Sequence, residues 1–263
     1  MLKTVILVSL VLAAHLAAAD NVAFFYALGA DLQGLKENAQ ENGQPLMVGT
    51  HSIHRLRLGS HTIHAVKMGS GPVETASAAQ ALLARFRCDW AFSTGPAGTL
   101  SSELSPGTWV RVGRIVAWQR VTAGSSGNIA ARSSDWDLDW LRLPVTNLPP
   151  IWNGNTLRSV ASGEAFIASD SERERLRAVT GADVVDMNSF GLAVVCADHN
   201  VPLFIWKIVS DRADKTAAED FRTFVSEYKG DGGRALAELI RALPPNPSDP
   251  ASYPAIERLM RED

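Results

Sequence analysis

The stretch "IWKIVSDRADKTAAEDF", residues 205–221, begins as a buried strand and ends in a cluster of charges. Its apolar run, Ile205 to Val209, leads directly to Ser210 and Asp211. Open α/β sheets bind ligands beyond the carboxyl ends of their strands, so a carboxylate at such a strand end is well placed for catalysis. Serine and aspartate are also common helix N-caps. A catalytic group and a cap for the next helix are therefore both open interpretations of this stretch.

The composition indicates a folded chain with one sizeable core. The chain has 263 residues, 46% of them hydrophobic, and a formal net charge of -3. A surface that binds nucleic acid needs clustered lysines and arginines, because these displace the counterions of the phosphates. The sequence shows no such basic stripe, so nucleic acid is excluded as the main partner.

The N-terminus "MLKTVILVSLVLAAHLAAAD" has the pattern of a cleaved secretory signal, with a lysine, an apolar run and small residues before Asp20. The apolar run is shorter than the roughly 20 residues that a membrane-spanning helix needs. We therefore expect residues 1–19 to be removed and residues 20–263 to form one periplasmic or secreted domain, with no membrane contact after cleavage. Cys88 and Cys196 lie in apolar surroundings typical of buried free thiols.

Hydrophobic periodicity along the mature chain predicts strands that alternate with helices. The predicted strands are residues 21–28, a hairpin within 51–69, 90–95, 109–121, 163–169, 182–187 and 202–210, and the predicted helices are 31–41, 72–86, 171–180, 189–200 and 232–243. Such alternation is typical of an α/β fold with a mainly parallel sheet and helices on both faces. The segment 122–155 is irregular, and we interpret it as a lid.

Two local patterns look like ligand-binding motifs, but the spacing or composition of each does not fit such a motif. His51 and His54, like His61 and His64, are spaced three apart on predicted strands, where such residues point to opposite faces. We therefore predict no metal site. The turn "GSGPVETA", residues 69–76, lacks the third glycine of a dinucleotide fingerprint and the lysine of a triphosphate loop. We interpret it as a tight strand-to-helix turn.

Five segments in the same order resemble the nucleoside phosphorylase superfamily, and within it the 5′-methylthioadenosine/S-adenosylhomocysteine nucleosidases. They are "ALGADL" (27–32), "GSGPVETASAA" (69–79), "STGPAGTL" (93–100), "SGEAFI" (162–167), and "VVDMNSFGLAVVC" (184–196) followed by "SDRAD" (210–214). The resemblance covers nearly the whole mature chain. It implies a three-layer αβα sandwich with a central mixed, mainly parallel sheet, the phosphorylase/hydrolase-like fold.

The resemblance also implies roles at the base end of a nucleoside. Asp211 occupies the position of the family's general acid, which protonates N7 of the purine, and Ser210 orients it. A carboxyl group must have a raised pKa to hold a proton near neutral pH. Phe166 is expected to stack on the purine, and the backbone of Ile167 to hydrogen-bond to its edge.

At the sugar end this sequence departs from the family. Asp31 aligns with the glutamate that activates water, and Gly95 lies in the third motif at the substrate. Met187 is retained beneath the ribose, but Asn188 replaces a glutamate that binds the ribose hydroxyls. Asparagine supplies no negative charge to the cationic transition state. Restoring glutamate at position 188 is therefore expected to raise turnover.

The expected activity is hydrolysis of adenosine-type nucleosides such as 5′-methylthioadenosine or S-adenosylhomocysteine. The first loop contains no arginine, Ser93 stands where the phosphorylases have their second arginine, and Pro96 replaces a serine in the glycine turn. Two alternatives remain open: a phosphate-dependent phosphorylase, and a non-catalytic purine nucleoside binder. The resemblance implies no cofactor, a small-molecule purine nucleoside as partner, and a homodimer.

Overall fold

The computed structural model describes residues 21–119, 122–123, 129–130, 140–143, 157–243 and 257–259. The predicted signal peptide and most of the predicted lid lie outside these ranges. In chain order the elements are β1 (Asn21–Tyr26), α1 (Gly29–Lys36), β2 (Gln40–Glu41), β3 (Leu46–Val48), β4 (His51–Leu58), β5 (His61–Lys67), α2 (Pro72–Leu83), β6 (Trp90–Thr99), β7 (Trp109–Ala117), β8 (Thr122–Ala123), β9 (Ile129–Ala130), β10 (Trp140–Arg142), β11 (Leu157–Ser162), α3 (Asp170–Thr180), β12 (Val184–Asp186), α4 (Ser189–Asp198), β13 (Leu203–Asp211), α5 (Ala217–Glu227), α6 (Asp231–Ala242) and β14 (Glu257–Leu259).

A single large mixed sheet forms the centre of the fold. Its described strands run in the order β14-β10-β7-β11-β12-β6-β1-β5-β4-β2, while β13 pairs with β6 and β7, and β3 pairs with β4. Strand β6 is parallel to β1 and β13 and antiparallel to β12. The residues of β13 are all buried, as a continuous apolar run predicts for a strand covered on both faces. Strands β6 and β13 therefore lie at the middle of the molecule.

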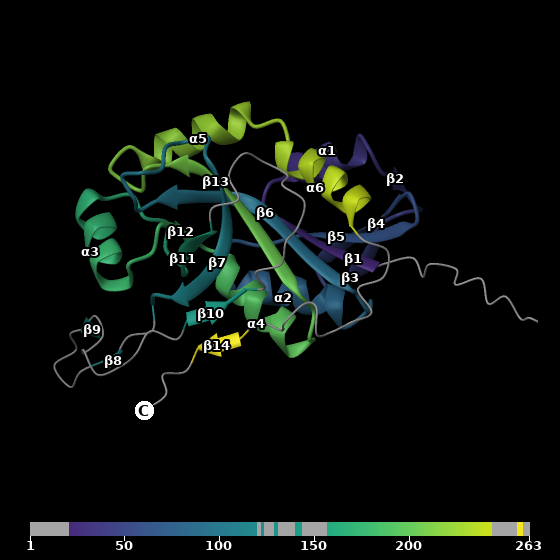
Figure 1. Ribbon diagram of the computed structural model, residues 1–263, viewed down its shortest axis with the longest axis horizontal. Helices are drawn as coiled ribbons and strands as arrows, with labels where there is room; N and C mark the ends of the chain where they lie inside the picture. The colour runs from purple at the N-terminus through teal and green to yellow at the C-terminus, as the bar shows by residue number, and fades with distance from the viewer. Residues whose placement is uncertain are drawn as a thin grey trace, which may run out of the picture.

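Helices cover both faces of the sheet (Figure 1). One apolar cluster includes residues of α2 and α4, and another includes residues of α1 and α6. Helices α2 and α4 approach closely, because a methyl group on Gly191 would lie 2.2 Å from the carbonyl oxygen of Pro72. The predicted three-layer αβα sandwich is confirmed.

The element boundaries differ from the sequence predictions at several points. Helix α1 ends at Lys36, and the end of the helix predicted at 31–41 is instead strand β2 (Gln40–Glu41). The strand predicted at 163–169 is wrong: β11 ends at Ser162, and the following residues up to Ser169 form a loop. A side chain on Gly163 would collide with the indole of Trp118. Only glycine therefore fits without a shift where the chain turns away from the sheet. Helix α5 was not predicted at all. No helix in the described ranges is long and apolar enough to cross a membrane.

Candidate active site

A cavity of about 210 Å³ lies at the carboxyl ends of the parallel strands. Strands β1, β5, β6, β12 and β13, or the loops that follow them, all contribute to its lining, as does the loop after β11. Ligands of open α/β sheets bind at this edge. Of the residues predicted from sequence, six line this one cavity: Ser210, Asp211, Phe166, Ile167, Met187 and Asn188.

Asp211 is the last residue of β13 and its side chain is held from two sides. One carboxylate oxygen accepts a hydrogen bond from the Ser210 hydroxyl at 2.7 Å, and the other accepts one from the backbone N–H of Ala213 at 2.9 Å. The β13–β6 register shifts between Val209 and Asp211, a bulge that re-aims the strand end. A methyl group on Gly98 would lie 2.8 Å from the carboxylate, so β6 needs a glycine here.

The burial of Asp211 raises the pKa of its carboxyl group. The residue is only 1% exposed. Burial is the main cause that raises the pKa of Asp211 above its ordinary range, and the hydrogen bonds from Ser210 and Ala213 oppose it in part. A carboxyl group with a raised pKa that lines a cavity can act as a general acid.

The structure shows that Ser210 and Asp211 do not cap the next helix. The next helix, α5, begins at Ala217, and Thr216 occupies its N-cap position. Ser210 and Asp211 lie in β13, several residues before that helix. Both residues line the cavity at the strand end.

An aromatic pair lines the same cavity as Asp211. Phe166, in the loop after β11, is 44% exposed, and its ring lies 5.6 Å from that of Phe221 in a T-shaped arrangement. The loop keeps Phe166 at the cavity while Ile167 packs into a small apolar cluster. Such paired rings suit a flat aromatic ligand. Phe221 was missed by the sequence prediction, since helix α5 that carries it was not predicted.

Asn188 is oriented by its amide group. Its Nδ2 donates to the carbonyl oxygen of Gly69 at 2.6 Å and to the hydroxyl of Thr75 at 2.9 Å. The carbonyl of Gly69 can only accept, which fixes the amide nitrogen on that side. Asn188 thereby ties the residue after β12 to the glycine turn before α2.

These contacts reverse the expectation for glutamate at position 188. In Asn188→Glu, a carboxylate replaces the amide donor beside the Gly69 carbonyl oxygen, so the hydrogen bond to Gly69 is lost and two acceptors face each other. We expect a loss of about 1–3 kcal/mol in the free energy of unfolding, and no gain in turnover. Urea denaturation and kcat measure the two effects, with Asn188→Gln as the control that keeps the amide. A stable Asn188→Glu enzyme with a higher kcat would contradict this account.

Two buried charges lie next to the Asn188 segment. Asp186 ends β12, and its Oδ2 lies 2.6 Å from Nζ of Lys207 on β13. Their side chains are 1% and 0% exposed. Asp186 lines the cavity. The sequence prediction assigned neither residue a role, because only the strand order brings them together.

Asp31 and Gly95 are not among the described residues that line the cavity. Asp31 is 0% exposed, and its carboxylate accepts hydrogen bonds from Tyr228 at 2.6 Å and Thr94 at 2.9 Å. The backbone N–H of Gly233, in the first turn of α6, is a further donor. In this structure the carboxylate therefore joins α1 to α6. The water-activating role of Asp31 and the substrate contact of Gly95 stay predictions.

The described residues do not offer a metal centre. Within those ranges, no three histidine, cysteine, aspartate or glutamate side chains gather as ligands. His54 is bound to Glu41 at 2.6 Å, and His51 contacts Ser77 at 2.9 Å. Both histidines thus have protein partners.

Comparison with known proteins agrees with the fold and the motifs. The phosphorylase superfamily matches residues 21–241. The aminodeoxyfutalosine nucleosidase of Campylobacter jejuni is 28% identical over 164 residues, covering 59% of this chain and 70% of the relative. The 5′-methylthioadenosine/S-adenosylhomocysteine nucleosidase of Thermotoga maritima is 30% identical over 161 residues, covering 60% and 70%. A futalosine hydrolase structure from Helicobacter pylori has a TM-score of 0.73 at 16% identity, covering 86% of this chain and 99% of that one. The chain belongs to the phosphorylase superfamily.

Proposed function

We propose that this chain is a purine nucleosidase that hydrolyses the N-glycosidic bond of adenosine-type nucleosides such as 5′-methylthioadenosine or S-adenosylhomocysteine. The observation that carries the proposal is Asp211, a buried carboxyl group with a raised pKa that lines the cavity at a strand end. The names of the two sequence relatives, both nucleosidases, support the same reaction class.

The proposed reaction uses Asp211 as the proton donor. Asp211 donates its proton to N7 of the purine, and the electron pair of the bond between C1′ and the base leaves with the base. The sugar carbon becomes cationic and is attacked by the oxygen of a water molecule. That water loses one proton, which restores the Asp211 carboxyl group. The products are free adenine and the ribose with its 5′ substituent.

The two aromatic rings and the loop after β11 supply recognition of the base. Phe166 stacks on the purine, Phe221 closes its edge, and the backbone of Ile167 hydrogen-bonds to it. Met187 packs under the ribose, and the carbonyl oxygen of Asn188 accepts a ribose hydroxyl. All five residues line the cavity.

Hydrolysis is favoured over phosphorolysis by the charges at the cavity. Among the described residues that line it, Lys67 is the sole cationic side chain, and no arginine lines it. Pro96 also lines the cavity, and proline has no N–H to offer an oxyanion. A phosphate dianion would need more donors than these.

A second candidate function is a nucleoside binder without turnover. The observation that favours it is the packing of Asp31 between Thr94 and Tyr228, because this carboxylate is the one predicted to activate water. Binding would use the same aromatic pair and the same ribose contacts.

One experiment separates these functions. Purified mature chain is incubated with 5′-methylthioadenosine and adenosine, with and without phosphate, and free adenine is measured. The hydrolase releases adenine and the free sugar at a rate that does not depend on phosphate. A phosphate-dependent rate with ribose 1-phosphate as product would identify a phosphorylase, and micromolar binding without release over hours would identify a binder.

The cellular location and the oligomeric state of the enzyme are also part of the proposal. The N-terminal segment supports export to the periplasm or the exterior, and the resemblance supports a homodimer. Sequencing the N-terminus of the exported protein tests cleavage before Asp20. Sedimentation of the mature chain tests the dimer, and a single monomeric species at micromolar concentration would reject it.

A further inference from the structure

The ion pair of Asp186 and Lys207 crosses the strand at the centre of the sheet. Strands β12 and β13 both pair with β6, β12 antiparallel and β13 parallel. Nζ of Lys207 and Oδ2 of Asp186 are 2.6 Å apart, and both side chains are excluded from bulk solvent. In such a site the surroundings screen a charge far less than water does.

The pair has a definite orientation relative to the cavity. Asp186 lines the cavity, whereas Lys207 lies behind the lining, where a methyl group on Gly95 would be 3.7 Å from its Nζ. Of the two charged residues, the negative one is therefore the one that belongs to the cavity lining.

The carboxylate of Asp186 is held in a fixed position and in its ionised form. It accepts hydrogen bonds from the backbone N–H of Ser189 at 3.1 Å and from the Ser189 hydroxyl at 2.5 Å, at the start of α4. Burial by itself raises the pKa of Asp186, but Lys207 and the hydroxyls of Ser189 and Ser162 outweigh it and bring the pKa below its usual range. The group is preorganised before any ligand arrives.

We propose that Asp186 is the residue that stabilises the cationic sugar as the N-glycosidic bond breaks, in place of the charge that Asn188 lacks. The inference rests on the proposed function and deepens it. A fixed charge aimed at the place where the opposite charge develops stabilises a transition state more than a ground state. Lys207 acts through Asp186, as a positioning residue that keeps the carboxylate ionised.

The test compares two analogues that differ in the charge of the sugar ring. One carries a protonated pyrrolidine in place of the ribose, the class of ligand bound to a Helicobacter pylori nucleosidase structure. The other has the same base and a carbon ring in place of the pyrrolidine, so that it carries no charge. Asp186→Asn is expected to lower the affinity for the pyrrolidine analogue by about tenfold or more, and the affinity for the neutral analogue by less than about threefold. Calorimetry measures both affinities.

A double variant keeps the test valid if Asp186→Asn alone leaves an unpaired ammonium that prevents folding. Asp186→Asn combined with Lys207→Met removes both charges and leaves the net charge of the protein unchanged. It should show the same selective loss of the cationic analogue. Equal affinity changes for the two analogues in a folded variant would overturn the proposal.

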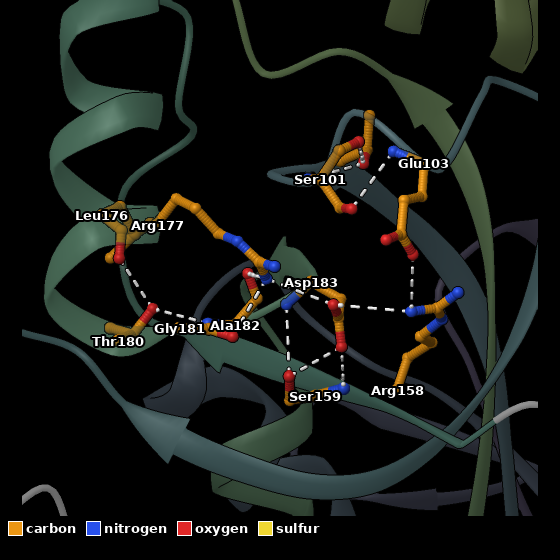
Figure 2. Close-up of polar contacts among 11 residues, drawn as sticks. Ser101, Glu103, Arg158, Ser159, Leu176, Arg177, Thr180, Gly181, Ala182 and Asp183 are labelled. Carbon is orange, nitrogen blue, oxygen red and sulfur yellow. Dashed lines mark hydrogen bonds and ion pairs between the residues drawn. The ribbon is translucent and has the colours of Figure 1, made fainter.

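Asp183 provides a matched control at the other end of the same segment. It lies before β12, and Figure 2 shows its carboxylate bound to Ser159 and close to the guanidinium groups of Arg158 and Arg177. Burial by itself raises the pKa of Asp183, but hydrogen bonds from Ser159 and the guanidinium group of Arg177 hold it below its usual range. Asp183 does not line the cavity. Asp183→Asn should lower stability and leave the ratio of the two affinities unchanged, whereas a matching change in that ratio would count against Asp186.

The outcomes also separate this inference from the proposed function. Binding of the analogues needs no turnover, so the comparison is valid even for a slow enzyme. If the unmodified protein binds neither analogue, the proposed function fails and this inference fails with it. If the unmodified protein binds both and the Asp186→Asn ratio is unchanged, the inference alone fails.

Discussion

Asp211→Asn is expected to lower kcat for adenine release by about 10²- to 10⁴-fold, the range that general acid catalysis typically supplies. The amide has the shape of the carboxyl group but cannot transfer a proton to the leaving base. KM should change little, because the aromatic pair and the ribose contacts are left intact. The measurement is steady-state adenine release from 5′-methylthioadenosine in phosphate-free buffer.

The pH profile adds a readout that a merely structural role would not change. The reaction needs protonated Asp211, and burial raises its pKa, so kcat should fall as the pH rises through that raised value. Asp211→Asn should lack this decline. Asp183→Asn is the matched control, since Asp183 bonds to Ser159, does not line the cavity and is not among the charges that shift the pKa of Asp211. Turnover in Asp211→Asn at the unmodified rate would exclude Asp211 as the acid.

The sequence predicted the layers of the fold because its buried strands and amphipathic helices alternate clearly. It predicted a strand at 163–169, because the apolar run there is typical of a buried strand, whereas strand β11 ends at Ser162. In the structure the run serves two other purposes: Ile167 packs beneath α3, and Phe166 lines the cavity. Periodicity cannot distinguish these uses from a strand, since both require apolar side chains.

The polar contacts of the site could be predicted only in part. Motifs identified Asp211, Met187 and Asn188, which line one cavity. The pairing of Asp186 with Lys207 depends on the positions of β12 and β13 on either side of β6, and hydrophobic pattern carries no information on that strand order. The amide orientation of Asn188 depends likewise on the Gly69 carbonyl, far away in sequence.

Asp31→Ala is expected to lower the free energy of unfolding by roughly 2–5 kcal/mol, because several buried donors lose their acceptor at once. The hydroxyls of Tyr228 and Thr94 and the N–H of Gly233 all point at this carboxylate. Asp31 itself is 0% exposed in the contact between α1 and α6. Urea denaturation measures the change, and a loss below about 1 kcal/mol would contradict the packing role.

Asp31→Asn separates that packing role from the predicted activation of water. Burial is the main cause that raises the pKa of Asp31, so the folded protein binds this proton more tightly than the unfolded chain does. The resulting stabilisation is complete below the unfolded pKa, about 3.9, and is lost as the pH rises through the folded value. Asparagine cannot titrate, so Asp31→Asn should flatten this part of the stability profile. If Asp31 only packs, kcat of the folded variant should stay within about threefold of the unmodified enzyme. A fall near 10²-fold with unchanged stability would instead assign the carboxylate to the chemistry, and would require it to move toward the cavity when substrate binds.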